Sequence, residues 1–131
     1  MKTRPDLGVT MCGVRFANPF ILSSSPVSNS AEMVEKAYER GWAGVCYKTL
    51  NSGRIPIVHP SPRMATYDYE AKRLVGLQNV EQISDRPLAD NLADFLYLKK
   101  RWPDRPIIAS IMGFSNDEWA FLARAAADNG A

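Results

Sequence analysis

The sequence has few of the residues that build metal sites and disulfide frameworks. Its 131 residues include two cysteines and one histidine. Cys12 and Cys46 have no accompanying histidine pattern, so a structural zinc site is not expected. A disulfide is not expected either, because we expect a cytoplasmic protein, and that compartment is reducing. His59 has no catalytic partner in view and is interpreted as a loop residue.

Long apolar runs and a strong charge bias are also missing. No run approaches the roughly 18 apolar residues of a membrane span, and residues 1–10 lack the apolar segment of a signal peptide. Sixteen basic and 14 acidic residues leave a net charge of +2, too balanced to indicate a nucleic-acid or membrane partner. The glycine-rich patterns of dinucleotide-binding and P-loop proteins are absent.

The chain does contain three short apolar runs that alternate with helical patterns. The runs lie at 18–26, 43–48 and 105–113, and each is continuous, as in strands buried on both faces of a parallel sheet. Helices are predicted after Asn29, over 87–103 and from Ser115 to Gly130. A small β-hairpin turning at Gly13 is predicted over 9–19. The order indicates an α/β fold with right-handed crossovers.

Local signals place the helix ends. Asn29 with Glu32, and Ser115 with Glu118, match capping boxes. Pro87 suits the first helical position, and Gly41 suits the position after a helix end. The predicted apolar side of the second helix comprises Leu88, Leu92, Phe95, Leu96 and Leu98.

The sequence ends just past a helix, where another strand is due. Two interpretations are open: a compact three-layer α/β domain, or the first part of a larger barrel. A complete (β/α)8 barrel needs about 250 residues. We favour the second interpretation, in which residues 1–131 form a partial barrel domain truncated before its fourth strand.

Polar side chains gather at the predicted strand ends. The first run ends on Ser23 and Ser24, the second on Lys48 and Thr49, and the third near Ser110. Ligands of parallel α/β sheets collect at these carboxyl ends, and a cation among hydroxyls suits an anionic or carbonyl-rich ligand. The alternative is that the lysine reaches water and the serines only form turns.

The segment 51–83 is predicted to be a long loop. Loops of this length often act as lids or binding segments, although a surface excursion is the alternative. Within it, Asn79 offers one donor and one acceptor, which matches the edge of a pyrimidine base. A turn or cap role is the alternative for this asparagine.

Five blocks of sequence then occur in a characteristic order: "MCGVRFANPFILSSSP", "GWAGVCYKT", "SPR", "GLQNVEQI" and "IIASIMG". Together they resemble the FMN-dependent dihydropyrimidine dehydrogenases, above all the flavin-bearing subunits of the bacterial NAD-dependent enzymes. Class 1 dihydroorotate dehydrogenases are more distant. The resemblance implies the N-terminal (βα)3 part of a TIM barrel preceded by a short β-hairpin.

The resemblance also implies roles for individual residues. Ser23, Ser24, Lys48 and Thr49 would contact FMN, and Asn79 and Glu81 would contact the pyrimidine substrate. The intact enzyme would take electrons from NADH through an NAD-binding partner subunit and iron–sulfur clusters, and would be an oligomer. The family's catalytic cysteine would lie beyond Ala131, so no catalytic residue is assigned and the chain alone is expected to be inactive. A dihydroorotate dehydrogenase-like enzyme and a non-catalytic α/β ligand-binding module are the alternatives.

Overall fold

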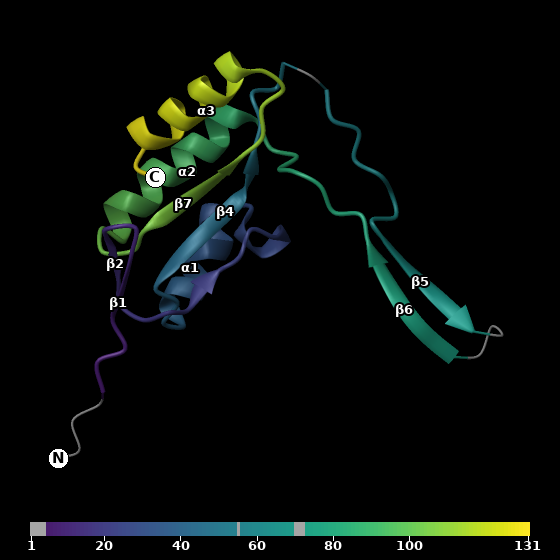
Figure 1. The fold of residues 1–131 in the computed structure, drawn as a ribbon, viewed down its shortest axis with the longest axis horizontal. Coiled ribbons are helices and arrows are strands. Elements are labelled where there is room, and N and C mark those ends of the chain that lie inside the picture. The colour runs from purple at the N-terminus through teal and green to yellow at the C-terminus, as the bar shows by residue number, and fades with distance from the viewer. Residues whose placement is uncertain (1–4, 55, 70–72) are drawn as a thin grey trace.

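The computed structural model describes residues 5–54, 56–69 and 73–131. Its centre is a parallel sheet of three strands in the order β3 (Ile21–Leu22), β4 (Gly44–Leu50) and β7 (Ile107–Ile111). The helices α1 (Ala31–Glu39), α2 (Leu88–Arg101) and α3 (Asn116–Asp128) follow these strands along the chain and pack against the sheet (Figure 1). A short 3-10 helix, η1 (Pro26–Ser28), precedes α1. The predicted α/β class with parallel strands is therefore confirmed.

Two antiparallel hairpins flank this sheet. The first pairs β1 (Val9–Met11) with β2 (Val14–Phe16) and turns at Cys12 and Gly13, whose φ angles are 50° and 79°. The second pairs β5 (Met64–Tyr69) with β6 (Arg73–Asn79). We call β5 and β6 the arm, since they extend away from the sheet and helices in Figure 1.

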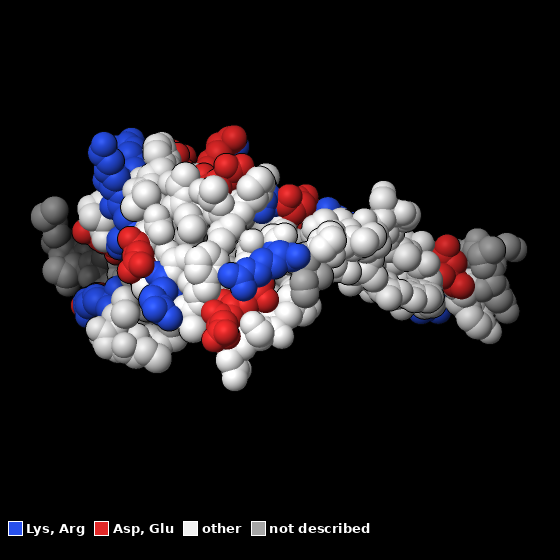
Figure 2. Space-filling model, turned by 90° about the horizontal axis from the view of Figure 1, so that it is seen from above, with Lys and Arg blue, Asp and Glu red and all other residues white. Residues whose placement is uncertain are grey.

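The arm corrects the prediction that 51–83 is only a loop. Every residue of β5 is exposed, and so is every residue of β6 except Gly76, which is half-buried. A strand that buries neither face needs no continuous apolar run, so β5 and β6 lack the signal that predicted the three strands of the parallel sheet. Figure 2 shows that most of the arm surface is uncharged, with acidic atoms near its far end.

The core lies between the sheet and the helices. Val45, Tyr47 and Ile107 point from the strands into a cluster completed by helix side chains. The ring of Tyr47 meets that of Phe95 edge-on, with centroids 4.9 Å apart, a favourable aromatic geometry. In the described part of the chain, no helix has the length and apolar character needed to cross a membrane.

Several predicted helix details need correction. Ser30, not Asn29, caps α1, because its Oγ accepts a hydrogen bond from Met33 N at 3.3 Å. Pro87 lies one position before α2 rather than at its first residue. Leu96 is 54% exposed and lies off the apolar face. Ser115 caps α3 as predicted, but the Glu118 carboxylate accepts from Phe114 N and Ser52 and does not complete the box.

Gly44 allows β2 to close over the start of β4. A Cβ added there would lie 2.8 Å from Cε1 of the buried Phe16 and 3.1 Å from the Pro106 carbonyl oxygen. We expect Gly44→Ala to lower the free energy of unfolding by about 1–3 kcal/mol through overpacking, measured by urea denaturation. The control is Gly76→Ala, where the nearest atoms lie 3.7 Å away. Equal losses in the two variants would contradict this explanation.

Candidate functional site

An irregularity in β4 places two polar residues opposite one residue of β7. Tyr47 pairs with Ala109 and Leu50 pairs with Ile111, so Lys48 and Thr49 together oppose Ser110. Tyr47 and Leu50 belong to the helix-side core, and Thr49 Oγ1 lies 2.8 Å from Ser110 Oγ. A bulge of this kind redirects side chains locally. Lys48 and Thr49 therefore lie near the carboxyl end of β4, where the sequence predicts them.

Lys48 is buried and paired. Its side chain is 6% exposed, and its Nζ lies 3.3 Å from Oε1 of Glu81. The alternative in which this lysine simply reaches water is therefore wrong. Burial by itself would raise the pKa of the Glu81 carboxyl, but hydrogen bonds and positive charge from Lys48 and Arg63 lower it overall. Glu81 is thus held as a carboxylate at neutral pH.

The pairing continues beyond Glu81. Arg63 Nη1 lies 3.1 Å from Glu81 Oε1, and Arg63 Nη2 lies 3.3 Å from Asp85 Oδ2. Asp85 Oδ1 accepts a hydrogen bond from Asn29 Nδ2 at 3.0 Å, which is the first cause of its lowered pKa. We call Lys48, Glu81, Arg63 and Asp85 the ion-pair chain. It connects the end of β4 to the base of the arm and to the residues before α1.

Three other predicted site residues, Asn79, Ser23 and Ser24, form no ion pair with the ion-pair chain. Asn79 is exposed at the end of β6, and its Oδ1 accepts from Glu81 N at 2.8 Å, so it does form the turn that was the alternative. Ser23 and Ser24 directly follow β3 and are exposed. Among the hydrogen bonds of the described residues, their hydroxyls reach neither Lys48 nor Thr49. The structure thus brings Lys48 to Glu81 and Thr49 to Ser110.

Sequence analysis missed Arg63 and Asp85 as members of the site. Arg63 stands in the quoted "SPR" block, but no role was assigned to it. Arg63 directly precedes β5 and Glu81 closely follows β6, so their charges meet only through the pairing of two strands that the sequence did not predict. The backbone confirms this closure, since Val80 N donates to Arg63 O at 2.8 Å.

A second polar network lies on the helix-covered side of β4, around the Asp94 carboxylate. The Asp94 carboxylate accepts from Tyr47 OH at 2.7 Å, from Ala31 N at 2.8 Å and from the Arg86 guanidinium. Burial and the neighbouring Asp94 raise the pKa of the Tyr47 hydroxyl, which therefore stays protonated. This network ties β4, α1 and α2 together beneath the ion-pair chain.

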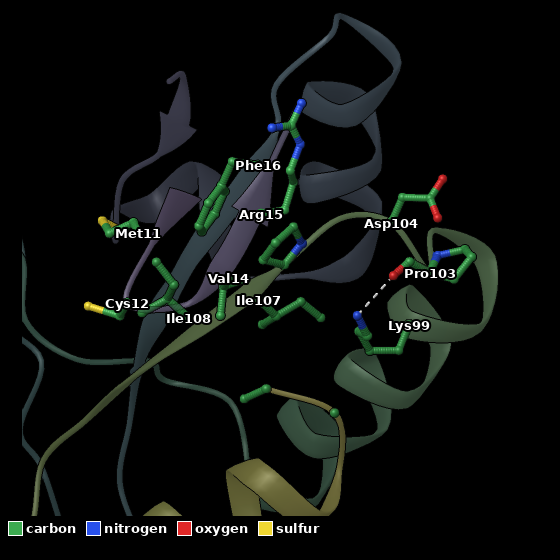
Figure 3. A pocket seen from close by; sticks show the side chains of 13 residues that line it. Met11, Cys12, Val14, Arg15, Phe16, Lys99, Pro103, Asp104, Ile107 and Ile108 are labelled. Carbon is green, nitrogen blue, oxygen red and sulfur yellow. Dashed lines mark hydrogen bonds between the residues drawn. The ribbon is translucent and has the colours of Figure 1, made fainter. Parts of the chain in front are cut away.

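An apolar groove lies at the opposite end of the sheet. It has a volume of about 750 Å³ and is formed by the first hairpin, the start of β7 and the end of α2. Figure 3 shows Met11, Val14 and Ile108 around it, with Lys99 Nζ donating to the Pro103 carbonyl oxygen at 3.1 Å. None of the predicted site residues lines it, so this groove is separate from the candidate site.

The donor set at the strand end fits a flavin edge. An ammonium has three N–H donors, and one of those of Lys48 is directed to Glu81, which leaves donors for a ligand. The Thr49 and Ser110 hydroxyls, which lie 2.8 Å apart near the same strand ends, can each donate or accept. Flavin rings present carbonyl oxygens and ring nitrogens, which such groups recognise. Within the described residues, no three candidate ligands are grouped to hold a metal ion.

Comparison with known proteins confirms the resemblance to the dihydropyrimidine dehydrogenases. The chain is 47% identical over 126 residues to the NAD-dependent dihydropyrimidine dehydrogenase subunit PreA of Escherichia coli (strain K12). It is 38% identical over 116 residues to the chloroplastic dihydropyrimidine dehydrogenase (NADP(+)) of Arabidopsis thaliana. It is 32% identical over 120 residues to the catalytic subunit of dihydroorotate dehydrogenase B (NAD(+)) of Pyrococcus horikoshii.

These alignments cover most of the chain but only part of each relative. They include 96%, 85% and 89% of the chain, and 30%, 27% and 35% of the respective relatives. The chain thus spans about a third of the length of the curated relatives it matches. No family model matches the chain.

Proposed function

We propose that the chain is part of an FMN-dependent oxidoreductase that interconverts uracil or thymine with the 5,6-dihydropyrimidine, using NAD(H). The observation that carries the proposal is that a buried Lys48 ammonium and the paired Thr49 and Ser110 hydroxyls occupy one register position near the carboxyl ends of neighbouring parallel strands. The similarity to PreA supports the same activity.

The residues divide into two groups. Ser23, Ser24, Lys48 and Thr49 would hold FMN, and a cation at Lys48 favours negative charge on the flavin ring. FMN, when bound, supplies the hydride-transfer chemistry. Asn79 and Glu81 would orient the pyrimidine through an amide and a carboxylate.

The proposal extends to the surrounding protein. Residues 1–131 would form the (βα)3 part of a TIM barrel that a fourth strand continues beside β7. An NAD-binding partner subunit and iron–sulfur clusters would supply electrons, in a cytoplasmic oligomer. PreA is named as a subunit, which supports a multi-subunit enzyme. We expect no turnover by the 131 residues alone, because the resemblance implies that the family's catalytic cysteine lies in another part of the protein.

The similarity to dihydroorotate dehydrogenases favours a second candidate, with dihydroorotate as substrate. That substrate carries a carboxylate, and binding it calls for a cation free of other carboxylates. At the described site, Lys48 and Arg63 are both paired with acidic side chains. This pairing supports a neutral pyrimidine over dihydroorotate.

FMN titration of the full-length protein tests the proposal. We expect the flavin fluorescence to be quenched on binding, and Thr49→Val to weaken the affinity about fivefold through loss of one hydrogen bond. Ser115→Ala is the control, since Ser115 caps α3 and its hydroxyl accepts from Glu118 N. Uracil and dihydroorotate are then compared as substrates of the flavin-loaded protein. Absence of FMN binding would reject the flavoenzyme, and binding without turnover of either substrate would favour the non-catalytic module.

A further inference from the structure

Arg63 joins the two ends of the arm to each other. Its Nη1 lies 3.1 Å and 3.4 Å from the two oxygens of Glu81, and its carbonyl oxygen accepts from Val80 N. Both contacts cross the base of the arm, where β5 begins and β6 has just ended. The guanidinium is therefore fixed by the backbone pairing of the arm as well as by its own charge.

Glu81 is shared between two cations. Its Oε1 lies 3.3 Å from Lys48 Nζ and 3.1 Å from Arg63 Nη1, and its side chain is 15% exposed. An enclosed ammonium is costly once its counter-charge is removed. Without Arg63, only Lys48 would hold the carboxylate in place, and Glu81 could rotate toward the water around the arm.

The second carboxylate anchors Arg63 to the body of the protein. Asp85 accepts from Arg63 and from Asn29, and Asn29 Oδ1 in turn accepts from Ser84 Oγ at 2.6 Å. Ser84 N also donates to Thr49 O at 2.8 Å, at the end of β4. Arg63 thus lies between two carboxylates. That of Glu81 faces Lys48, and that of Asp85 is held by Asn29 near the end of β4.

We propose that Arg63 is a positioning residue that holds Glu81 against Lys48 and thereby sets the place of the Lys48 cation at the flavin site. Arg63 acts through Glu81 and does not itself touch the ligand. The same contact steadies Asn79, because the Asn79 amide oxygen accepts from Glu81 N. The effect of Arg63 on flavin binding rests on the proposed function, whereas its effect on the position of Lys48 does not.

The test compares Arg63→Gln, Arg63→Lys and Arg15→Gln in the full-length protein. Arg15 pairs with Asp6 at 3.2 Å on the exposed first hairpin, so its variant breaks an arginine–carboxylate pair away from the site. The first readout needs no flavin: the rate at which trace acetic anhydride acetylates Lys48, followed by mass spectrometry. Arg63→Gln should raise this rate at least about tenfold, as loss of one charge-assisted contact implies. Arg15→Gln should leave it unchanged.

The second readout is FMN affinity, which Arg63→Gln should lower about tenfold and Arg63→Lys should lower less, because lysine keeps the charge but not the two-carboxylate contact. Gly44→Ala is expected to destabilise the fold while leaving Arg63 intact. Its Lys48 should be acetylated as slowly as in the wild type. This variant therefore separates the positioning of Lys48 from a general loss of stability.

The possible failures are distinguishable. If wild-type protein does not bind FMN, the proposed function fails while acetylation still decides the role of Arg63. If Arg63→Gln is folded and its Lys48 reacts at the wild-type rate, the inference is overturned. Should Arg63→Gln not fold, Arg63→Lys carries the test, and a wild-type acetylation rate in that variant overturns the inference.

Discussion

Lys48→Met is expected to weaken FMN binding by about 10- to 150-fold, the equivalent of losing a charge-assisted hydrogen bond of roughly 1.5–3 kcal/mol. Methionine retains an unbranched apolar stem that can occupy the same space beside Thr49 and Ser110. The ammonium is lost, and with it the positive charge proposed to face the flavin. Glu81 keeps Arg63 as its counter-charge, so the site retains a paired carboxylate. Titration by flavin fluorescence measures the loss.

The matched control for this substitution is Lys36→Met. Lys36 also pairs with a glutamate, Glu32, but both side chains are mostly exposed on α1. Exposed ion pairs contribute little, and this one lies away from the strand ends. Lys36→Met should bind FMN as the wild type does. A Lys48→Met protein that is folded and binds FMN with wild-type affinity would contradict the assignment of Lys48 to the flavin site.

Asp94→Ala is expected to produce the largest loss of stability, about 3–5 kcal/mol in the free energy of unfolding, since it breaks an enclosed ion pair. The substitution removes the acceptor for Tyr47 OH, for Ala31 N and for the Arg86 guanidinium. It therefore leaves donors from β4, α1 and the segment before α2 without their shared acceptor. Urea denaturation measures the change, with Glu32→Ala on the exposed face of α1 as a control that should alter stability little.

The effect of Asp94 should also depend on pH. Burial raises the pKa of its carboxyl, but hydrogen bonds from Arg86, Tyr47 and Ala31 outweigh burial and lower the pKa in the folded protein. A carboxyl with a lowered folded pKa stabilises the fold fully above its unfolded pKa of about 3.9, and that contribution is lost as the pH falls through the folded value. The stability gap between wild type and Asp94→Ala should therefore narrow between pH 7 and pH 3. A gap of constant size would contradict this role.

The regular elements could be predicted because their signals are local. The runs around Ile21, Val45 and Ile107 are continuously apolar, and strands buried on both faces require this. Ser115 and Gly41 mark helix ends through backbone conformations and caps that depend on a few neighbouring residues. Asn29 was taken for a cap because it, like Ser30, suits that position. Its side chain is instead directed to Asp85 and Ser84, which lie more than fifty residues away in the sequence.

The sequence by itself determined three apolar strands, the helices between them, the first hairpin and the presence of a lysine near a strand end, since each depends on neighbouring residues. Only the tertiary structure decided that Lys48 and Thr49 share the place opposite Ser110, that β5 and β6 form an arm, and that Glu81 and Arg63 close over Lys48. These features depend on strand register and on ion pairs between residues 18 and 33 positions apart in the chain. Local patterns carry no information on such pairings, because burial and Coulomb attraction act between side chains that only folding makes neighbours.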